Sequence, residues 1–183
     1  VGLGDLLLFF GLFRRIEMLN GSYTRVRDAR PCPVIWGWLQ VAEVLHLGNS
    51  RRQGYEWARY HPHFNRGADP NNVVYFAQRQ LEIDELTENL PGAGTFSQFS
   101  YDRQLTAPHA ENLSTWDLPG WFHPGDNKKP LTYHSDMQRW QNRGDRTELM
   151  AVARGQEFVL DCNEYPEAVQ WARDLIWGRE NEC

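Results

Sequence analysis

Cysteine is scarce in this chain of 183 residues, and the three that occur are far apart. They are Cys32, Cys162 and Cys183, and no two of them have the C-x-x-C spacing of a zinc ribbon or a redox motif. An odd number of scattered cysteines also argues against a disulfide scaffold. We therefore predict a reduced, cytoplasmic protein.

Long apolar runs are also missing. The densest one, "GDLLLFFGLF" over residues 4–13, has seven large apolar residues in ten, which falls short of the about 20 that a transmembrane helix needs. The chain opens on Val1 with no basic region before this run, which is not the pattern of a signal peptide. We expect no membrane partner.

Lysine is nearly absent, so arginine carries the positive charge. Residues 1–66 hold nine arginines against five acidic side chains, whereas residues 67–183 hold ten basic and nineteen acidic side chains. Guanidinium groups match phosphate oxygens in a bidentate manner. A compositional preference for arginine explains the same counts. The asymmetry nevertheless predicts a phosphate-binding face near the end of the first apolar run, formed by Arg14, Arg15, Arg25, Arg27 and Arg30.

Two segments have apolar residues on both faces of an extended chain. Residues 5–13 predict a buried strand. Residues 34–47 predict a strand that is covered on two sides or lines a barrel, with Gly37 marking a bulge or a close approach. Because unpaired backbone groups are costly, we expect these two strands to pair in one sheet. Between them, Asn20-Gly21 predicts a turn.

The rest of the chain mixes short strands with few helices. Residues 81–90 predict a short helix, and residues 97–148 have no clean period. The C-terminal residues predict a longer helix that ends at Gly178. We therefore expect one domain over residues 1–183 of the α+β class, with a small mixed sheet or a β-barrel, flanking short helices and a C-terminal helix.

Catalytic motifs of fixed spacing are lacking, since the chain has no G-x-S-x-G, H-E-x-x-H or P-loop pattern. The "HPH" motif places His61 and His63 two residues apart, but no third metal ligand follows from the spacing. We expect no metal and no cofactor. Glu157, Asp117 and His63 are candidates for a general acid or base.

The chain is rich in tryptophan, with eight residues. Aromatic faces stack on nucleobases, and Arg and Gln side chains suit the reading of a base edge. The tryptophans are equally explained by packing in the hydrophobic core. The Arg and Gln side chains at residues 154–158 are equally explained by a hairpin exposed to solvent. The base-binding interpretation predicts a pocket that contains Trp36 or Trp38 from the strand beside Trp116 or Trp121 from a loop. Arg154 and Gln156 are the candidates for reading the base edge.

The order of motifs resembles two known groups. A "GD" turn, an apolar strand and a following strand with a central Gly resemble the PUA-like superfamily over residues 4–47, which includes EVE, ASCH and YTH domains. That resemblance implies a PUA-like β-barrel with an aromatic pocket for an extruded or modified base.

A wider resemblance rests on seven motifs in order: "GDLLLFFGLFR", "GWLQV", "HPH", "NNVVYFA", "PGAGTF", "LTYH" and "RGQEFVL". These resemble the C-terminal portion of the nucleotide modification associated domain 3 family. The resemblance implies an association with phage and bacterial systems that make or respond to modified DNA bases. It also implies that this chain lacks an N-terminal segment that members of the family carry.

Three hypotheses follow. The leading one is a domain that binds nucleic acid, DNA in particular, or a modified nucleotide, and recognises a modified or extruded base in a DNA modification or phage-conflict system. The alternative is an enzyme of glycosylase, hydrolase or transferase type that acts on a modified base or nucleotide. The third is an interaction module within a larger assembly.

Overall fold

The computed structural model describes residues 1–48, 54–66, 69–83, 86–87, 90–152 and 158–178. The chain divides into two compact units, which we call unit 1 (Val1–Leu8 and Gly37–Thr95) and unit 2 (Phe9–Trp36 and Phe96–Cys183). The expectation of a single domain remains a prediction, and it requires both units to unfold in one transition.

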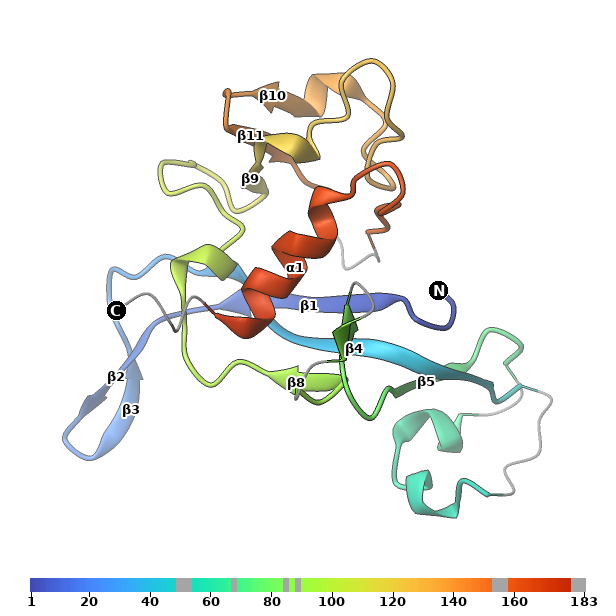
Figure 1. Ribbon diagram of the computed structural model, residues 1–183. Helices are drawn as coiled ribbons and strands as arrows, with labels where there is room; N and C mark the ends of the chain where they lie inside the picture. The colour runs from blue at the N-terminus through green and yellow to red at the C-terminus, as the bar shows by residue number, and fades with distance from the viewer. Residues whose placement is uncertain (49–53, 67–68, 84–85, 88–89, 153–157, 179–183) are drawn as a thin grey trace. The chain divides into compact units, whose positions relative to one another are not determined.

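The longest strand is β4 (Cys32–His46), which contributes residues to both units. It pairs with β1 (Leu6–Phe13), β5 (Val73–Ala77) and β8 (Ala93–Thr95), as Figure 1 shows. The predicted pairing of the first two apolar segments is therefore confirmed. The prediction that β1 is buried is wrong, because β1 stands at the edge of this sheet and none of its residues is fully buried.

Three smaller sheets complete the strands that the structure describes. They are antiparallel: β10 (Trp140–Asn142), β11 (Arg146–Met150) and β9 (Thr115–Pro119); β2 (Ile16–Leu19) and β3 (Ser22–Arg25); β6 (Glu82–Ile83) and β7 (Leu86–Thr87). The described strands close no barrel. The short helix predicted over residues 81–90 is wrong, since β6 and β7 occupy part of that range.

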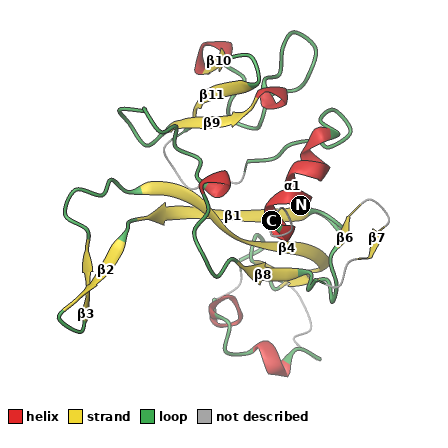
Figure 2. Ribbon diagram, turned by 60° about the vertical axis from the view of Figure 1, so that its left-hand side comes forward, coloured by secondary structure: helices red, strands yellow, loops and turns green. Residues whose placement is uncertain are grey.

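Helical structure is limited to one α-helix and several short turns of 3-10 helix among the described residues, so the α+β class is confirmed at this coarse level (Figure 2). The 3-10 turns are Glu56–Ala58, Pro62–Asn65, Tyr101–Arg103, Gly120–Phe122 and Met137–Arg139. No helix in the described part of the chain is long and apolar enough to span a membrane.

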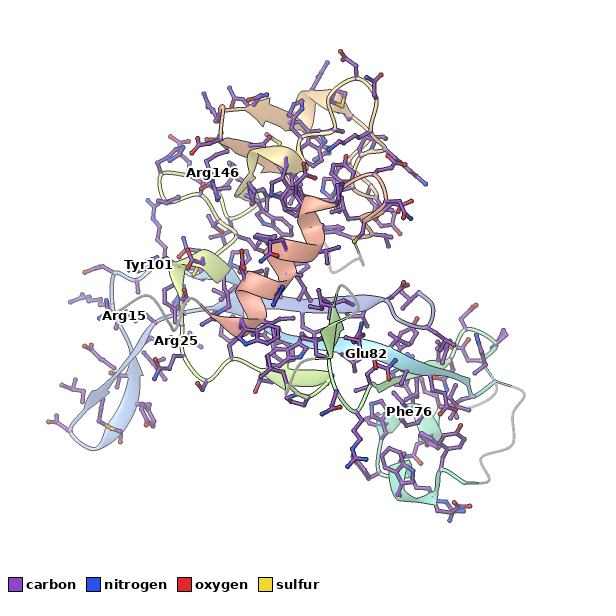
Figure 3. All side chains as sticks on the ribbon, viewed as in Figure 1. Arg15, Arg25, Phe76, Glu82, Tyr101 and Arg146 are labelled. Carbon is purple, nitrogen blue, oxygen red and sulfur yellow. The ribbon has the colours of Figure 1, made fainter. Side chains whose placement is uncertain are left out.

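Unit 1 is organised around the buried side chain of Gln40 in β4. Its amide nitrogen donates to the carbonyls of Glu82 at 2.7 Å and Gly4 at 3.3 Å, while its amide oxygen accepts from the Glu82 N–H at 2.8 Å. The Gln40 backbone adds bonds to Gly92 and Gln78. Figure 3 marks Glu82 beside this strand. The side-chain amide thus joins β4 to the segments at Gly4 and Glu82, and none of its own groups is left unsatisfied.

A close approach of two strands explains two glycines of unit 1. Gly37 and Trp38 of β4 pair with Thr95 and Gly94 of β8. A Cβ on Gly37 would lie 2.7 Å from the Gly94 carbonyl oxygen, which confirms the predicted close approach. A Cβ on Gly94 would lie 2.5 Å from the Trp38 ring. The Trp38 indole N–H donates to the Pro91 carbonyl at 3.1 Å and holds the ring in place.

A separate apolar cluster in unit 1 packs the end of β4 against β5 and the 3-10 turns. Phe76 stacks on Tyr55 at 5.2 Å between ring centroids and contacts Trp57 at 5.5 Å. Trp57 itself is largely exposed. The buried members are Leu45, Leu47, Ala58, Phe64 and Val74.

The core of unit 2 forms where the β10–β11–β9 sheet meets aromatic residues from distant segments. Phe10 of β1 contacts the Trp116 ring edge-on at 5.1 Å, and Phe158 contacts Trp116 at 5.5 Å. His134 is fully buried beside Phe158, and its ring bridges two backbone groups. This aromatic packing forms the core of unit 2, whereas unit 1 is held together around Gln40.

The helix α1 (Glu167–Trp177) belongs to unit 2, and its buried residues are Ala168, Ala172, Leu175 and Ile176. Trp171 on the same helix contacts Phe122 edge-on at 5.2 Å. The helix ends at Gly178, whose φ of 69° suits glycine and not other residues, so the predicted stop is confirmed.

Gly94→Ala should destabilise the protein, because its new methyl group would overlap the buried Trp38 ring. We expect the free energy of unfolding in urea to fall by about 1–3 kcal/mol, as in other overpacked sites. Gly11→Ala, also in a strand, is the control, since its Cβ would meet its neighbours at an ordinary 3.4 Å. Equal stability of the two variants would contradict the close approach.

The buried ring of His134 should make stability depend on pH. Its Nδ1 donates to the Thr132 carbonyl at 2.8 Å, and its Nε2 accepts from the Val152 N–H at 3.1 Å, so the folded protein holds the neutral form. Burial, aided by the charge of Arg139, lowers the pKa of His134 below its ordinary value.

The unfolded chain then binds a proton below about pH 6.5 that the folded protein does not. The free energy of unfolding should therefore decrease as the pH falls below that value, by up to about 1.4 kcal/mol per pH unit from this group. His134→Gln should remove this part of the slope, and the exposed control His109→Gln should keep it. An identical slope in both variants would refute the assignment.

Candidate functional site

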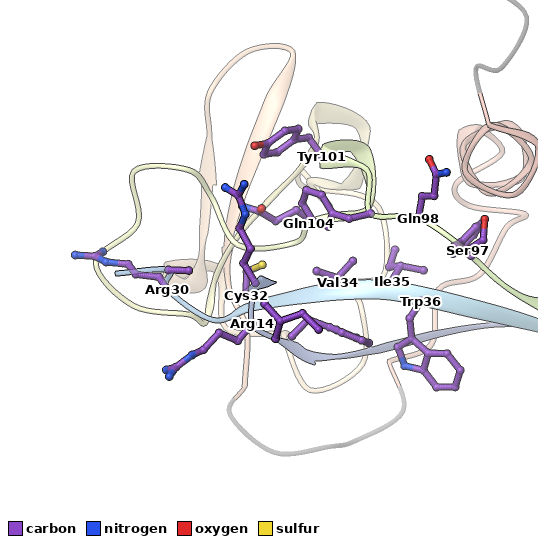
Figure 4. A pocket seen from close by; sticks show the side chains of 16 residues that line it. Arg14, Arg30, Cys32, Val34, Ile35, Trp36, Ser97, Gln98, Tyr101 and Gln104 are labelled. Carbon is purple, nitrogen blue, oxygen red and sulfur yellow. The ribbon is translucent and has the colours of Figure 1, made fainter. Parts of the chain in front are cut away.

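Unit 2 contains a pocket of about 730 Å³ at the end of β1 and the start of β4. Its third wall is the segment that follows β8, residues 96–104 (Figure 4). This volume lies within the about 300–1,000 Å³ typical of small-molecule sites. Its lining is mainly aromatic and basic: Phe13, Trp36, Phe96, Phe99 and Tyr101, with Arg14, Arg15 and Arg30 and the amides Gln98 and Gln104.

Long-range backbone hydrogen bonds attach the pocket wall to β4. The Phe96 N–H donates to the Trp36 carbonyl at 3.0 Å, and Leu105 N–H donates to the Pro33 carbonyl at 2.9 Å. Gln104 also forms an isolated bridge with Val34. These bonds hold residues 96–104 along the first residues of β4, and the segment between the two attachment points forms the pocket wall.

The five arginines predicted to bind phosphate are all exposed, but they do not all lie at the same place. Arg14, Arg15 and Arg30 line the pocket. Arg25 lines an adjoining hollow that shares Phe13 and Arg14 with it. Arg27 lines neither. Figure 3 marks Arg15 and Arg25 where β2 and β3 begin and end. Their contact with phosphate remains a prediction.

Trp36 presents an open ring at the pocket. It is 39% exposed and stacks on Phe9 at 5.4 Å, and Gly11 lies next to its ring nitrogen. In Figure 4 the Trp36 ring lies on one side of β4, and Gln98 and Tyr101 lie on the other. The aromatic side chains of the lining are therefore divided between the two sides of β4, and the Trp36 ring does not face Gln98 or Tyr101.

The wall formed by residues 96–104 was missed by sequence reasoning. Tyr101 is 83% exposed, and its ring contacts the Phe99 ring edge-on at 5.1 Å. The Arg103 guanidinium lies 4.1 Å from the centre of the Phe96 ring and donates to the Gln98 carbonyl at 2.6 Å. The aromatic spacing in "TFSQFSY" was the available signal, and it was hidden in a stretch without strand or helix period.

The other tryptophans predicted to bind a base lie in hydrophobic packing. Trp38 is 7% exposed in unit 1, and Trp116 is buried in the core of unit 2. Trp121 is half-buried and stacks on Phe122 at 4.0 Å. Neither Trp116 nor Trp121 lines the pocket around Trp36, so the expected pairing of strand and loop tryptophans does not occur there. Arg154 and Gln156 lie outside the described residues.

The comparison with protein families decides the affiliation. A model described as nucleotide modification associated domain 3 matches residues 1–161. The chain belongs to this family. The match confirms the resemblance carried by the seven motifs and links the chain to nucleotide modification, while the PUA-like resemblance is not confirmed. Comparisons with curated proteins and with solved structures gave no match.

The candidate acids and bases of this nucleotide modification associated domain have structural partners. The Asp117 carboxylate accepts a hydrogen bond from Arg146 Nε at 3.0 Å, and its second oxygen forms an ion pair with Arg146 Nη2 at 2.9 Å. In unit 1, the Nδ1 atom of His63 bonds the Val73 carbonyl at 3.1 Å. Glu157 lies outside the described residues. Neither Asp117 nor His63 lines the pocket.

Cys32 contributes a thiol to the pocket lining. Burial raises the pKa of this thiol, so it is protonated at neutral pH and is not activated as a nucleophile. Within the described residues, no three His, Cys, Asp or Glu side chains are grouped so that they could hold a metal ion. The aromatic rings, amides and guanidinium groups of the lining are suited to stacking, hydrogen bonding and charge attraction.

Arg103→Ala should loosen the pocket wall, because the substitution removes both the contact with Phe96 and the bond to Gln98. We expect the local stability of residues 97–104 to fall by about 1–2 kcal/mol, measured as faster amide hydrogen exchange. Arg79→Ala, an exposed arginine of unit 1, is the control. Unchanged exchange in residues 97–104 would show that Arg103 does not hold the wall.

Proposed function

We propose that this member of the nucleotide modification associated domain 3 family is a nucleic-acid-binding domain that recognises a modified or extruded base. The observation that carries the proposal is the pocket of unit 2, whose lining includes exposed aromatic rings, two amides and three arginines. The proposed partner is DNA, and the proposed setting is a bacterial or phage system that modifies DNA in the cytoplasm.

Stacking supplies the binding energy in this proposal. Trp36, Phe99 and Tyr101 all expose ring surface at the pocket. Each base that stacks on such a ring contributes roughly 1–3 kcal/mol, whereas extruding a base from a duplex costs a few kcal/mol. One stack on Tyr101, which lies on the same side of β4 as Gln98 and Gln104, together with hydrogen bonds from these amides is enough to offset that cost.

Charge supplies the position of the nucleotide. Arg14 and Arg15 follow β1 directly, and Arg30 precedes β4, so the arginines border the same pocket as the aromatic rings. Their guanidinium groups can grip phosphate oxygens in a bidentate manner while the attached base lies on the aromatic surface. The acidic balance of the whole chain, with a net charge of −5, limits this attraction to the arginine-rich part.

Trp36→Ala should weaken binding and, because the ring is partly exposed, should cost less stability than replacing the buried Trp38, although the stack on Phe9 is lost. We expect the affinity for single-stranded oligonucleotides with one modified base to fall by roughly 1–3 kcal/mol in fluorescence anisotropy. Trp57→Ala removes a more exposed ring, in unit 1 and away from the pocket, and is the control. Equal affinity of the two variants, or no binding by the parent protein to modified or unmodified strands, would contradict the proposal.

Replacing Arg14 and Arg15 together by Gln should reduce the salt dependence of binding. Each lost phosphate contact lowers the slope of log affinity against log salt by about one, so the double variant should lose about two. The reduction should be equal for all base sequences, because phosphate carries no sequence information. A slope equal to that of the parent protein would mean that these arginines do not face phosphate.

A further inference from the structure

The β2–β3 ribbon, residues Ile16–Arg25, is the most exposed regular element of unit 2. Its turn is formed by Asn20 and Gly21, with φ values of 51° and 78°, which is the backbone of a tight two-residue hairpin. All eight strand residues are exposed. Figures 1 and 2 show the ribbon extending beyond the end of β1 and the start of β4.

The register of the ribbon sorts its side chains onto two different faces. Ile16 pairs with Arg25 and Met18 with Tyr23, so these four share one face, which we call the apolar face. The opposite face carries two pairs, Glu17 with Thr24 and Leu19 with Ser22. The acidic Glu17 therefore lies on the opposite face, whereas Arg25 lies on the apolar face.

The apolar face is uncovered in the protein as described. Met18 is 56% exposed and Tyr23 is 73% exposed. A two-stranded ribbon is marginally stable in water by itself and is normally stabilised by packing on one face. The arrangement therefore calls for an external surface that covers the apolar face.

Charge indicates the nature of that surface. Residues 14–30, which contain the ribbon and both of its ends, hold five arginines and two acidic residues, a net charge of +3 in a chain whose net charge is −5. A polyanion complements this segment.

We propose that the β2–β3 ribbon enters the major groove of duplex DNA with its apolar face against the base edges. This proposal rests on the proposed function and adds a duplex-reading element to it. The major groove is about 12 Å wide and admits a two-stranded ribbon, whose strands lie about 4.8 Å apart. Arg25 can bond a guanine edge, and Met18 and Tyr23 can contact the methyl or other group at the 5-position of a pyrimidine.

The ribbon and the pocket are continuous in unit 2. Ile16 begins the ribbon and also lines the pocket, and Arg14 and Arg15 stand at the same junction. A ribbon lying in the groove thus brings the neighbouring nucleotides to the mouth of the pocket. The ribbon selects and grips the duplex, and the pocket receives the base.

The test replaces the two outer residues of the apolar face in one variant, Met18→Thr with Tyr23→Thr. Threonine keeps the preference for a strand, and both positions are exposed, so the fold is retained. The control is Leu19→Thr, an exposed apolar residue on the opposite face of the same ribbon. Anisotropy is measured with a short labelled duplex that has one mismatched base, and with the single strand alone.

We expect the double variant to bind the duplex roughly tenfold more weakly and the single strand as the parent does, with no change in the control. Replacing guanine by 7-deazaguanine, which alters the major groove alone, should weaken duplex binding by the parent protein but not by Arg25→Gln.

Three results would overturn the inference. If the parent protein and the double variant bind the duplex equally well, the ribbon does not contact the groove. Single-strand binding by both proteins would in that case still support the pocket. A dimer of the parent protein that becomes a monomer in the double variant, without change in DNA affinity, would identify a second copy as the partner of the ribbon. No binding to either probe by the parent protein would refute both the ribbon and the pocket.

Discussion

A strand of fifteen residues exists only if its backbone finds hydrogen-bond partners along its whole length, and this requirement shapes the chain around β4. The pairing comes from β1, β5 and β8, and near the start of the strand from residues 96–105. In unit 1 the Gln40 side chain ties two further segments to the strand, at Gly4 and at Glu82. The pocket of unit 2 is a consequence, because residues 96–104 form a wall while their ends bond to β4.

The same strand gives two neighbouring tryptophans different roles. Trp38 lies across Gly94, where the lack of a side chain allows the strands to approach, and its ring belongs to the core of unit 1. Trp36 lies in unit 2, stacks on Phe9 and keeps an open face beside the pocket. A buried ring contributes to stability, and an open ring beside arginines is suited to a base. The two functions of the aromatic residues are therefore divided along a single strand.

Sequence reasoning succeeded where local rules decide the structure. The Asn20-Gly21 turn, the pairing of the first two apolar segments and the helix end at Gly178 follow from backbone preferences and hydrophobic pattern. It failed where distant contacts decide. The pocket wall has no period of its own, because long-range bonds such as that from the Phe96 N–H to the Trp36 carbonyl position it. Likewise, the burial of Trp38 depends on Gly94, more than fifty residues away in sequence.

The central claim is that the open ring of Trp36 faces the nucleotide. The most direct measurement is an NMR titration of the indole N–H signals with a short single-stranded oligonucleotide that carries a modified base, with the Trp36 signal assigned from a Trp36→Phe variant. The account predicts that the Trp36 signal shifts with the oligonucleotide concentration while the signals of buried Trp38 and Trp116 stay in place. A titration in which Trp36 does not shift, or in which Trp57 of unit 1 responds instead, would contradict it.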